Sequence, residues 1–192
     1  MSPILTGVIA SGISGNLAPS ITGSFDALGS VTVPSGGLSS VTFQGIPQNY
    51  SHLQVRCLIK TTTNSNSDGG VYYQFNNDSS SLYSSHTIRG AGNSAAATSY
   101  GGVGGAAGFG FTTGSNGNNT DTFASYVIDI VDYTNPNIFK STKSIEGYNL
   151  NGVEGSVFFT SNNYRSTNAI NRITFTGATF AQNTRFSLYG VK

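Results

Sequence analysis

The segment His52-Leu-Gln-Val-Arg-Cys-Leu-Ile-Lys-Thr61 is the clearest indication of the fold class of this chain. Its apolar and polar residues alternate with a period of two, the pattern of a β-strand with one buried and one polar face. Leu58 interrupts the polar face, so we expect another segment or another subunit to cover part of it. The residues expected on the buried face are Leu53, Val55, Cys57 and Ile59.

Further strand patterns follow this stretch. Residues 123–133, FASYVIDIVDY, are apolar on both faces, as in a strand inside a sandwich or under a partner. Residues 30–33 and 41–43 are expected to form a hairpin across the turn at 34–37. Together these patterns predict an all-β protein, an antiparallel β-sandwich of jelly-roll type. The other expected strands are residues 71–75, 87–89, 139–146, 157–160, 172–175 and 184–191.

The length of 192 residues allows one sizeable core, preceded by an arm. Residues 1–25 carry no charged side chain and have neither a helical nor a strict strand period, so we expect an N-terminal anchoring arm (1–25) followed by a β-sandwich domain (26–192). So much apolar surface favours packing on a neighbouring protein or a neighbouring copy. The expected anchoring residues of the arm are Ile4, Leu5, Val8, Ile9, Ile13, Leu17 and Ile21.

Residues 90–120 consist largely of Gly, Ala, Ser and Asn. A segment of such low complexity buries little apolar surface, so we expect a long surface loop or an intersubunit packing segment. One short strand is expected within it, near residues 109–112.

Charge and cysteine content exclude several classes of function. The formal net charge is +1 and the basic residues are spread along the chain, so binding of nucleic acid through a basic face is not expected. A chain with only 9% charged residues associates readily with copies of itself. Cys57 is the only cysteine, which excludes an intramolecular disulfide and a thiolate metal cluster. No apolar run is long enough to predict a transmembrane helix or a membrane partner.

Two weak motifs bear on metals and phosphate. Residues 64–69, NSNSDG, resemble the start of a calcium loop, but Phe75 stands where the closing glutamate is required, so a polar hairpin tip is the preferred interpretation. The glycines of residues 101–110 lack the strand, helix and lysine of a phosphate-binding loop. No metal or cofactor is expected.

Acid–base and nucleophilic chemistry have little support. Asp129 with Asp132, or Glu146 with Glu154, could serve as the two carboxylates of a glycoside hydrolase, but nothing in the sequence sets their separation. His52 and His86 are the only histidines, and a Ser-His-Asp triad cannot be located around either. A non-enzymatic protein is the preferred hypothesis. The aromatic and polar residues near the loops are candidate contacts for a sugar or a protein, although half-buried tyrosines are the preferred interpretation. The candidates are Tyr72, Tyr73, Tyr83, His86 and Arg89.

Three segments of this chain resemble a group of small structural proteins of tailed bacteriophages, cyanophages among them. They are IPQNYSHLQVR (46–56), VIDIVDY (127–133) and the final FSLYGVK (186–192). The resemblance runs from about Asp26 to the end, and IASGISG (9–15) in the arm is also similar; residues 90–119 are the least similar part. It implies a virion component with a jelly-roll-like domain that assembles as a trimer, and it supplies no catalytic residues.

The leading hypothesis is therefore a capsid decoration or cement protein, anchored by its N-terminal arm. Its expected partners are copies of itself, as a homotrimer, and other virion proteins, namely major capsid or tail proteins. Its expected location is the surface of the phage particle, after synthesis in the host cytoplasm. The alternative is a tail-fibre or receptor-binding module that recognises host surface glycans. A glycan-degrading enzyme is the third hypothesis.

Overall fold

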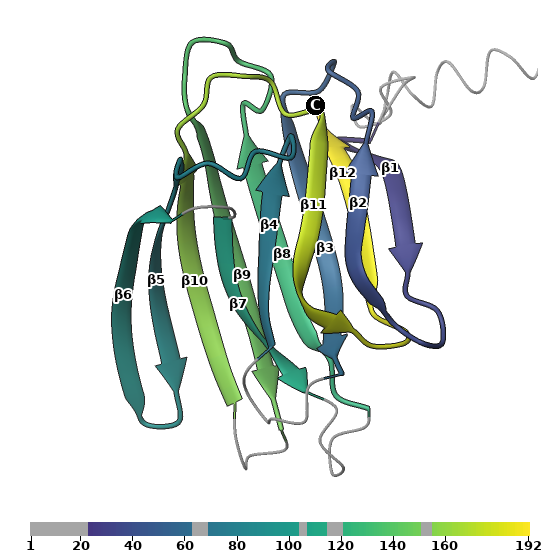
Figure 1. Ribbon diagram of the computed structural model, residues 1–192, viewed down its shortest axis with the longest axis vertical. Coiled ribbons are helices and arrows are strands. Elements are labelled where there is room, and N and C mark those ends of the chain that lie inside the picture. Colours follow the sequence, from purple (N-terminus) through teal and green to yellow (C-terminus); the bar gives the residue numbers. More distant parts are fainter. Residues whose placement is uncertain (1–22, 63–68, 104–106, 115–120, 151–154) are drawn as a thin grey trace, which may run out of the picture.

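The computed structural model describes residues 23–62, 69–103, 107–114, 121–150 and 155–192. These residues form twelve β-strands in two packed layers (Figure 1). The prediction of an all-β, antiparallel β-sandwich is therefore confirmed. No helix capable of spanning a membrane occurs among the described residues.

The two layers differ in width. All hydrogen-bonded neighbours within each layer are antiparallel, and the layers join at the end of β3, where Lys60 and Thr61 pair in parallel with β7. The strands of the larger layer are, in order, β1 (Phe25–Thr32), β12 (Arg185–Val191), β3 (His52–Thr61), β8 (Ala124–Val131), β9 (Lys140–Asn149), β10 (Gly155–Tyr164), β5 (Tyr83–Ala91) and β6 (Ser94–Val103). Those of the smaller layer are β2 (Leu38–Gln44), β11 (Arg172–Phe180), β4 (Gly69–Phe75) and β7 (Ala107–Gly114).

The chain alternates between the layers as it proceeds. β1, β3, β8 and β12 lie in the larger layer, and β2, β4, β7 and β11 lie in the smaller one. The remaining four strands form the β5–β6 and β9–β10 pairs, which both extend the larger layer (Figure 1). The larger layer therefore presents a broad face on the side away from the smaller layer, here called the outer face.

The strand that organises the fold is confirmed as β3, with the predicted bounds. Leu53 and Val55 are fully buried, and Cys57 and Ile59 are buried beside them. On β8, Val127 is 40% exposed although Ile128 is buried, so this chain alone does not cover both faces of the strand. Cover of the exposed face by a partner stays a prediction. The outer side of Leu58 is likewise open, at 41% exposed.

The thiol of Cys57 gives a direct check on this core. Burial, with a smaller contribution from Glu146, raises its pKa far above the ordinary value. Only a thiolate reacts readily with a disulfide reagent. We expect no reaction with Ellman's reagent in the native protein and one equivalent after denaturation. Rapid native reaction would show that this side of the sandwich opens easily.

The expected hairpin between residues 30–33 and 41–43 is wrong. β1 pairs with β12, and β2 pairs with β11 in the opposite layer. Gly36 and Gly37 adopt positive φ in the intervening turn, which carries the chain from one layer to the other. Each strand buries one side against the same core from opposite directions, and that burial outweighs local pairing.

The expected loop at residues 90–120 is also wrong over much of its length. It contains β6 and β7, and β6 pairs with β5 along its whole length. Gly92, with φ of 57°, supplies the tight turn between β5 and β6. The ladder bonds belong to the backbone, so small side chains do not prevent a strand from forming.

The predicted arm falls almost entirely outside the described residues, which begin at residue 23. Its anchoring residues and its function stay predictions. The calcium-like motif at residues 64–69 lies outside them as well, except for Gly69 in β4.

Candidate functional site

Four apolar side chains form a continuous strip across the outer face. Val127 on β8 lies opposite Ile145 on β9. Phe159 on β10 lies opposite both Ile145 and, on its other side, Ile88 of β5. Directly opposed residues in a sheet have their Cβ atoms about 5 Å apart. The four side chains are between 40% and 61% exposed. We call this strip the apolar row.

A shallow depression lies beside the apolar row. Gly147 stands two residues beyond Ile145 on β9, between Ser125 of β8 and Val157 of β10 in the register. Because Gly147 has no side chain, the sheet is hollowed there, with a volume of about 250 Å³. Val157 on its rim is exposed. The outer face thus combines a protruding apolar strip with a small apolar hollow.

The two edges of the larger layer differ in their protection. At the β1 edge the register is irregular between Ala27 and Gly29, and Asp26 forms an ion pair of 2.8 Å with Lys192. At the other edge, β6 has neither charged residues nor proline, and residues 94–101 are exposed. In the described part of the chain β6 pairs with β5 alone. Natural proteins usually protect such an edge, so an unprotected one favours pairing with another chain.

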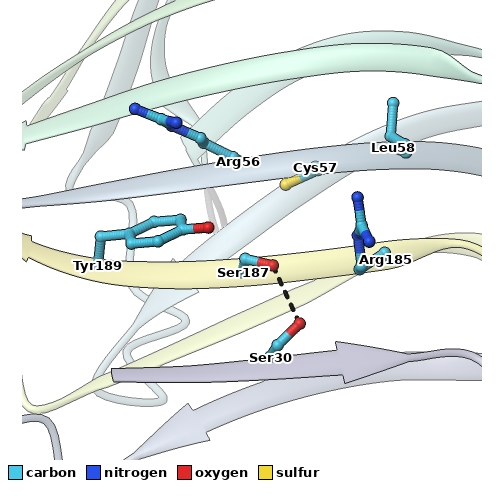
Figure 2. Close-up of a pocket in the computed structure, with 7 residues that line it drawn as sticks. All are labelled: Ser30, Arg56, Cys57, Leu58, Arg185, Ser187 and Tyr189. Carbon is cyan, nitrogen blue, oxygen red and sulfur yellow. Dashed lines mark hydrogen bonds between the residues drawn. The ribbon is translucent and has the colours of Figure 1, made fainter. Parts of the chain in front are cut away.

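A groove lies on the outer face between β1, β12 and β3 (Figure 2). Its volume is about 550 Å³, within the range of small-ligand sites. Figure 2 shows the side chains of Arg56 and Arg185 on this face, with the hydrogen-bonded Ser30 and Ser187 between β1 and β12. We call it the arginine groove. Its other lining residues are Cys57, Leu58 and Tyr189.

The inner face of β9, β10 and β5 carries a buried polar layer. Glu146 is only 3% exposed there, and Thr160 Oγ1 donates a hydrogen bond of 3.4 Å to its Oε1. Burial raises the pKa of Glu146 to about 7, although hydrogen bonds from Ser144 and Thr160 oppose the rise. Thr87 and Thr160 bond to each other at 3.1 Å. This carboxyl group faces the interior, so it affects stability rather than contacting a ligand on the outer face.

The structure describes three of the four carboxylates in the proposed acid–base pairs. Asp129 accepts a hydrogen bond of 2.8 Å from Gln54 Nε2 on the outer face. Asp132 lies in the turn after β8, with its carboxylate 3.4 Å from Nδ1 of His52. That nitrogen accepts the backbone N–H of Asp132 at 3.0 Å. Glu154, the proposed partner of Glu146, lies outside the described residues.

Tyr83 is not a surface contact, which corrects the sequence-based prediction. It is 1% exposed, and its ring stacks on Tyr164 at a centroid distance of 4.8 Å. Its hydroxyl donates to the carbonyl of Asp78 at 3.0 Å and accepts the N–H of Phe75 at 3.1 Å. These bonds keep a buried hydroxyl satisfied, so the ring belongs to the core.

The remaining candidates do not gather into one patch. Arg89 shares the inner face of β5 with Tyr83; it donates to Ser156 Oγ at 3.0 Å and lies over the ring of Phe158. His86 is exposed on the opposite, outer side of β5. Tyr72 is half-buried on β4 in the smaller layer. Odd sequence spacing in a strand places residues on opposite faces, which separates His86 from Arg89.

Sequence reasoning missed the apolar row because its residues come from four strands. The sequence signal that could have revealed this surface is an apolar residue at a strand position where the alternation predicts a polar, outward-facing side chain. Leu58 and Val127 are two such residues. Among the described residues, no three His, Cys, Asp or Glu side chains gather into a metal site. Compared with known proteins, the chain matches no family model, no curated protein and no solved structure. The functional proposal therefore depends on the surfaces described above.

Proposed function

We propose that this protein is a non-enzymatic structural component of a tailed-phage virion, which decorates or cements the capsid. In this proposal it assembles with copies of itself, as a homotrimer, and residues 1–25 anchor it to major capsid or tail proteins. The apolar row is the observation that carries the proposal of assembly. The resemblance of residues 46–56, 127–133 and 186–192 to phage structural proteins supports the assignment to a virion.

The energetic case for assembly comes from the exposed area of the apolar row. Burying the open part of each side chain contributes about 1 kcal/mol, so the four together contribute about 4 kcal/mol. A second copy is the occupant that fits best, because a net charge of +1 produces little repulsion between copies. The depression at Gly147 is lined partly by Val127 and Ile145 of the row itself, so an apolar side chain from another copy could pack there against both. The unprotected edge at β6 adds a second place for contact between chains.

The position of β1 supports an anchoring arm. β1 is an edge strand of the larger layer, and its first residue, Phe25, is 44% exposed. The backbone N–H of Lys192 bonds to the carbonyl of Ser24 at 3.1 Å, and Tyr50 donates to Asp26 at 3.0 Å. These contacts hold residues 24–26 against the rest of the sandwich. An arm bound to another protein would therefore be firmly attached to the β-sandwich domain.

The finer description of the fold belongs to this proposal. The orders β1-β12-β3-β8 and β2-β11-β4-β7, with chain alternation between layers, support a jelly roll with two inserted hairpins. Jelly rolls are common in viral capsid domains. The comparison is one of fold alone, so it supports a virion function only by analogy.

The anchoring function can be tested with a chain that begins at Gly23. Every contact described in the structure is retained in this variant, so we expect an unchanged thermal unfolding curve. On particles that lack the protein, we expect the full chain to bind and the shortened chain to be retained at least about tenfold less. Cosedimentation measures both. Equal retention of the two chains would contradict anchoring by the arm.

The alternative function, a tail-fibre or receptor-binding module for host glycans, has one specific observation in its favour. The arginine groove offers charged and hydroxyl groups on an exposed face. Tyr83 and Arg89, the residues first considered for such binding, face the interior and do not contribute to it.

A further inference from the structure

The arginine groove is lined by two arginines, Arg56 of β3 and Arg185 of β12. Arg56 lies opposite Ser187, and Arg185 lies opposite Leu58, so the two arginines are diagonal neighbours on β3 and β12. Diagonal residues in a sheet are about 7–8 Å apart, within reach of long side chains. Neither arginine forms an ion pair in the described part of the chain. Figure 2 shows the Arg56 side chain turned along β3 toward the Tyr189 side of the groove, with Arg185 at the other end.

Arg56 is held in place before any ligand arrives. Its Nε donates a hydrogen bond of 2.7 Å to Gln54 Oε1. Its guanidinium lies 5.4 Å from the ring centroid of Phe25 and 5.3 Å from that of Tyr189. These contacts leave the two terminal nitrogens of Arg56 available, in the fork geometry that matches two oxygens of a carboxylate or sulfate. Such preorganisation reduces the entropy lost on binding.

An acidic group on this face, Asp129, is a diagonal neighbour of Arg56 and is already hydrogen-bonded. Asp129 lies opposite Gln54, and it accepts the amide N–H of that residue at 2.8 Å. Gln54 thus bonds to Asp129 through its nitrogen and to Arg56 through its oxygen. This arrangement orients Arg56 without neutralising it by a direct ion pair.

Hydroxyl groups complete the groove. Ser30 Oγ lies 3.0 Å from Ser187 Oγ and can donate to the carbonyl of Phe186 at 3.2 Å. When Ser30 donates instead to Ser187, the proton of Ser187 becomes available to a ligand. Tyr189 adds an aromatic ring at the end of the groove (Figure 2). A ligand with hydroxyl groups beside its anionic group can use all of these features, whereas a bare ion cannot.

We propose that the arginine groove binds the oxyanion group, carboxylate or sulfate, of an acidic saccharide. Arg56 holds two oxygens of the anion, Arg185 supplies the second positive charge, and Ser187 bonds to a sugar hydroxyl. This site does not depend on assembly through the apolar row or on anchoring by the arm. Its failure would therefore leave the proposed structural function intact.

The test is a calorimetric titration of the full chain with glucuronate, with glucose and with sodium sulfate. We expect glucuronate to bind and glucose not to bind. Arg56→Lys keeps the charge but removes the fork, and Arg185→Gln removes the second charge; each should weaken glucuronate binding about tenfold. Lys143→Gln is the matched control, because Lys143 is a basic residue on the outer face of β9, opposite Asp129 and away from the groove.

The outcomes separate the possible ligands. Tighter binding of glucuronate than of sulfate supports the acidic saccharide. Equal binding of both supports an oxyanion site but overturns the saccharide assignment. If Lys143→Gln weakened glucuronate binding as much as the arginine variants do, the effect would be one of overall charge. If neither glucuronate nor sulfate bound, the proposed site would be refuted. Thermal unfolding of each variant checks that the fold is retained.

Discussion

The Glu146→Gln variant is expected to be more stable than the wild-type protein at about pH 8, by about 3 kcal/mol in the free energy of unfolding. The carboxyl group of Glu146 is buried, and its pKa is raised from the ordinary 4.5 to about 7. Above that pH the folded protein must hold a carboxylate away from water. Glutamine has nearly the same shape and carries no charge, so it avoids this cost while retaining an oxygen for Thr160.

The sign of the pH dependence follows from the direction of this pKa change. Between the ordinary value of 4.5 and about 7, the folded state binds a proton that the unfolded state releases. The contribution of protonated Glu146 to stability is therefore complete below 4.5 and is lost as the pH rises through about 7. Asp26 and Asp78 have lowered pKa values, so their contributions are lost at more acidic pH.

Urea denaturation at a series of pH values from about 5 to about 8.5 measures this effect. The difference between the wild type and Glu146→Gln should grow from about pH 5 to about pH 7 and then level off. Asp129→Asn is the matched control, since it removes a carboxylate that is exposed on the outer face. If the free energies of unfolding of the wild type and Glu146→Gln differed by the same amount at every pH, Glu146 would not be a buried carboxyl group in the folded protein.

The Ile145→Lys variant is expected to weaken self-association by about 100-fold or more, or about 3 kcal/mol. Ile145 is 59% exposed in the apolar row, between Val127 and Phe159. In an interface between copies, the ammonium group of lysine would lose its water without gaining a partner. The folded monomer should tolerate the change, because the side chain points to solvent.

Size-exclusion chromatography with light scattering, over a dilution series, gives the dissociation constants. Ile138→Lys is the matched control, because Ile138 is an exposed isoleucine in the turn between β8 and β9, outside the apolar row. We expect Ile138→Lys to associate as the wild type does. If Ile145→Lys also did so, the apolar row would not be the interface.

The alternating pattern of a strand could be predicted from sequence, but the partners of that strand could not. Residues 52–61 specify their own buried face, and the structure places Leu53 and Val55 there. The apolar row depends on which residue lies opposite which on four strands, and those registers are set by contacts far apart in the sequence. The expected hairpin of residues 30–33 and 41–43 failed for the same reason.

Two further errors have distinct physical causes. β6 is held in place by backbone hydrogen bonds to β5, and these do not require large side chains. The low complexity of this segment therefore did not indicate a loop. Tyr83 and Arg89 were candidate surface contacts because they lie near loops and polar residues in the sequence. Both share the inner face of β5, where Tyr83 meets Tyr164 and Arg89 meets Ser156.

We propose that this protein functions by assembling through the outer face of its larger layer. Sedimentation equilibrium of the full wild-type chain tests this proposal, because the mass of one chain is 20.0 kDa. We predict a mass that is a multiple of this value for the wild type and a value near 20.0 kDa for Ile145→Lys at the same concentration. A wild-type protein that remains at 20.0 kDa at every concentration would contradict the claim.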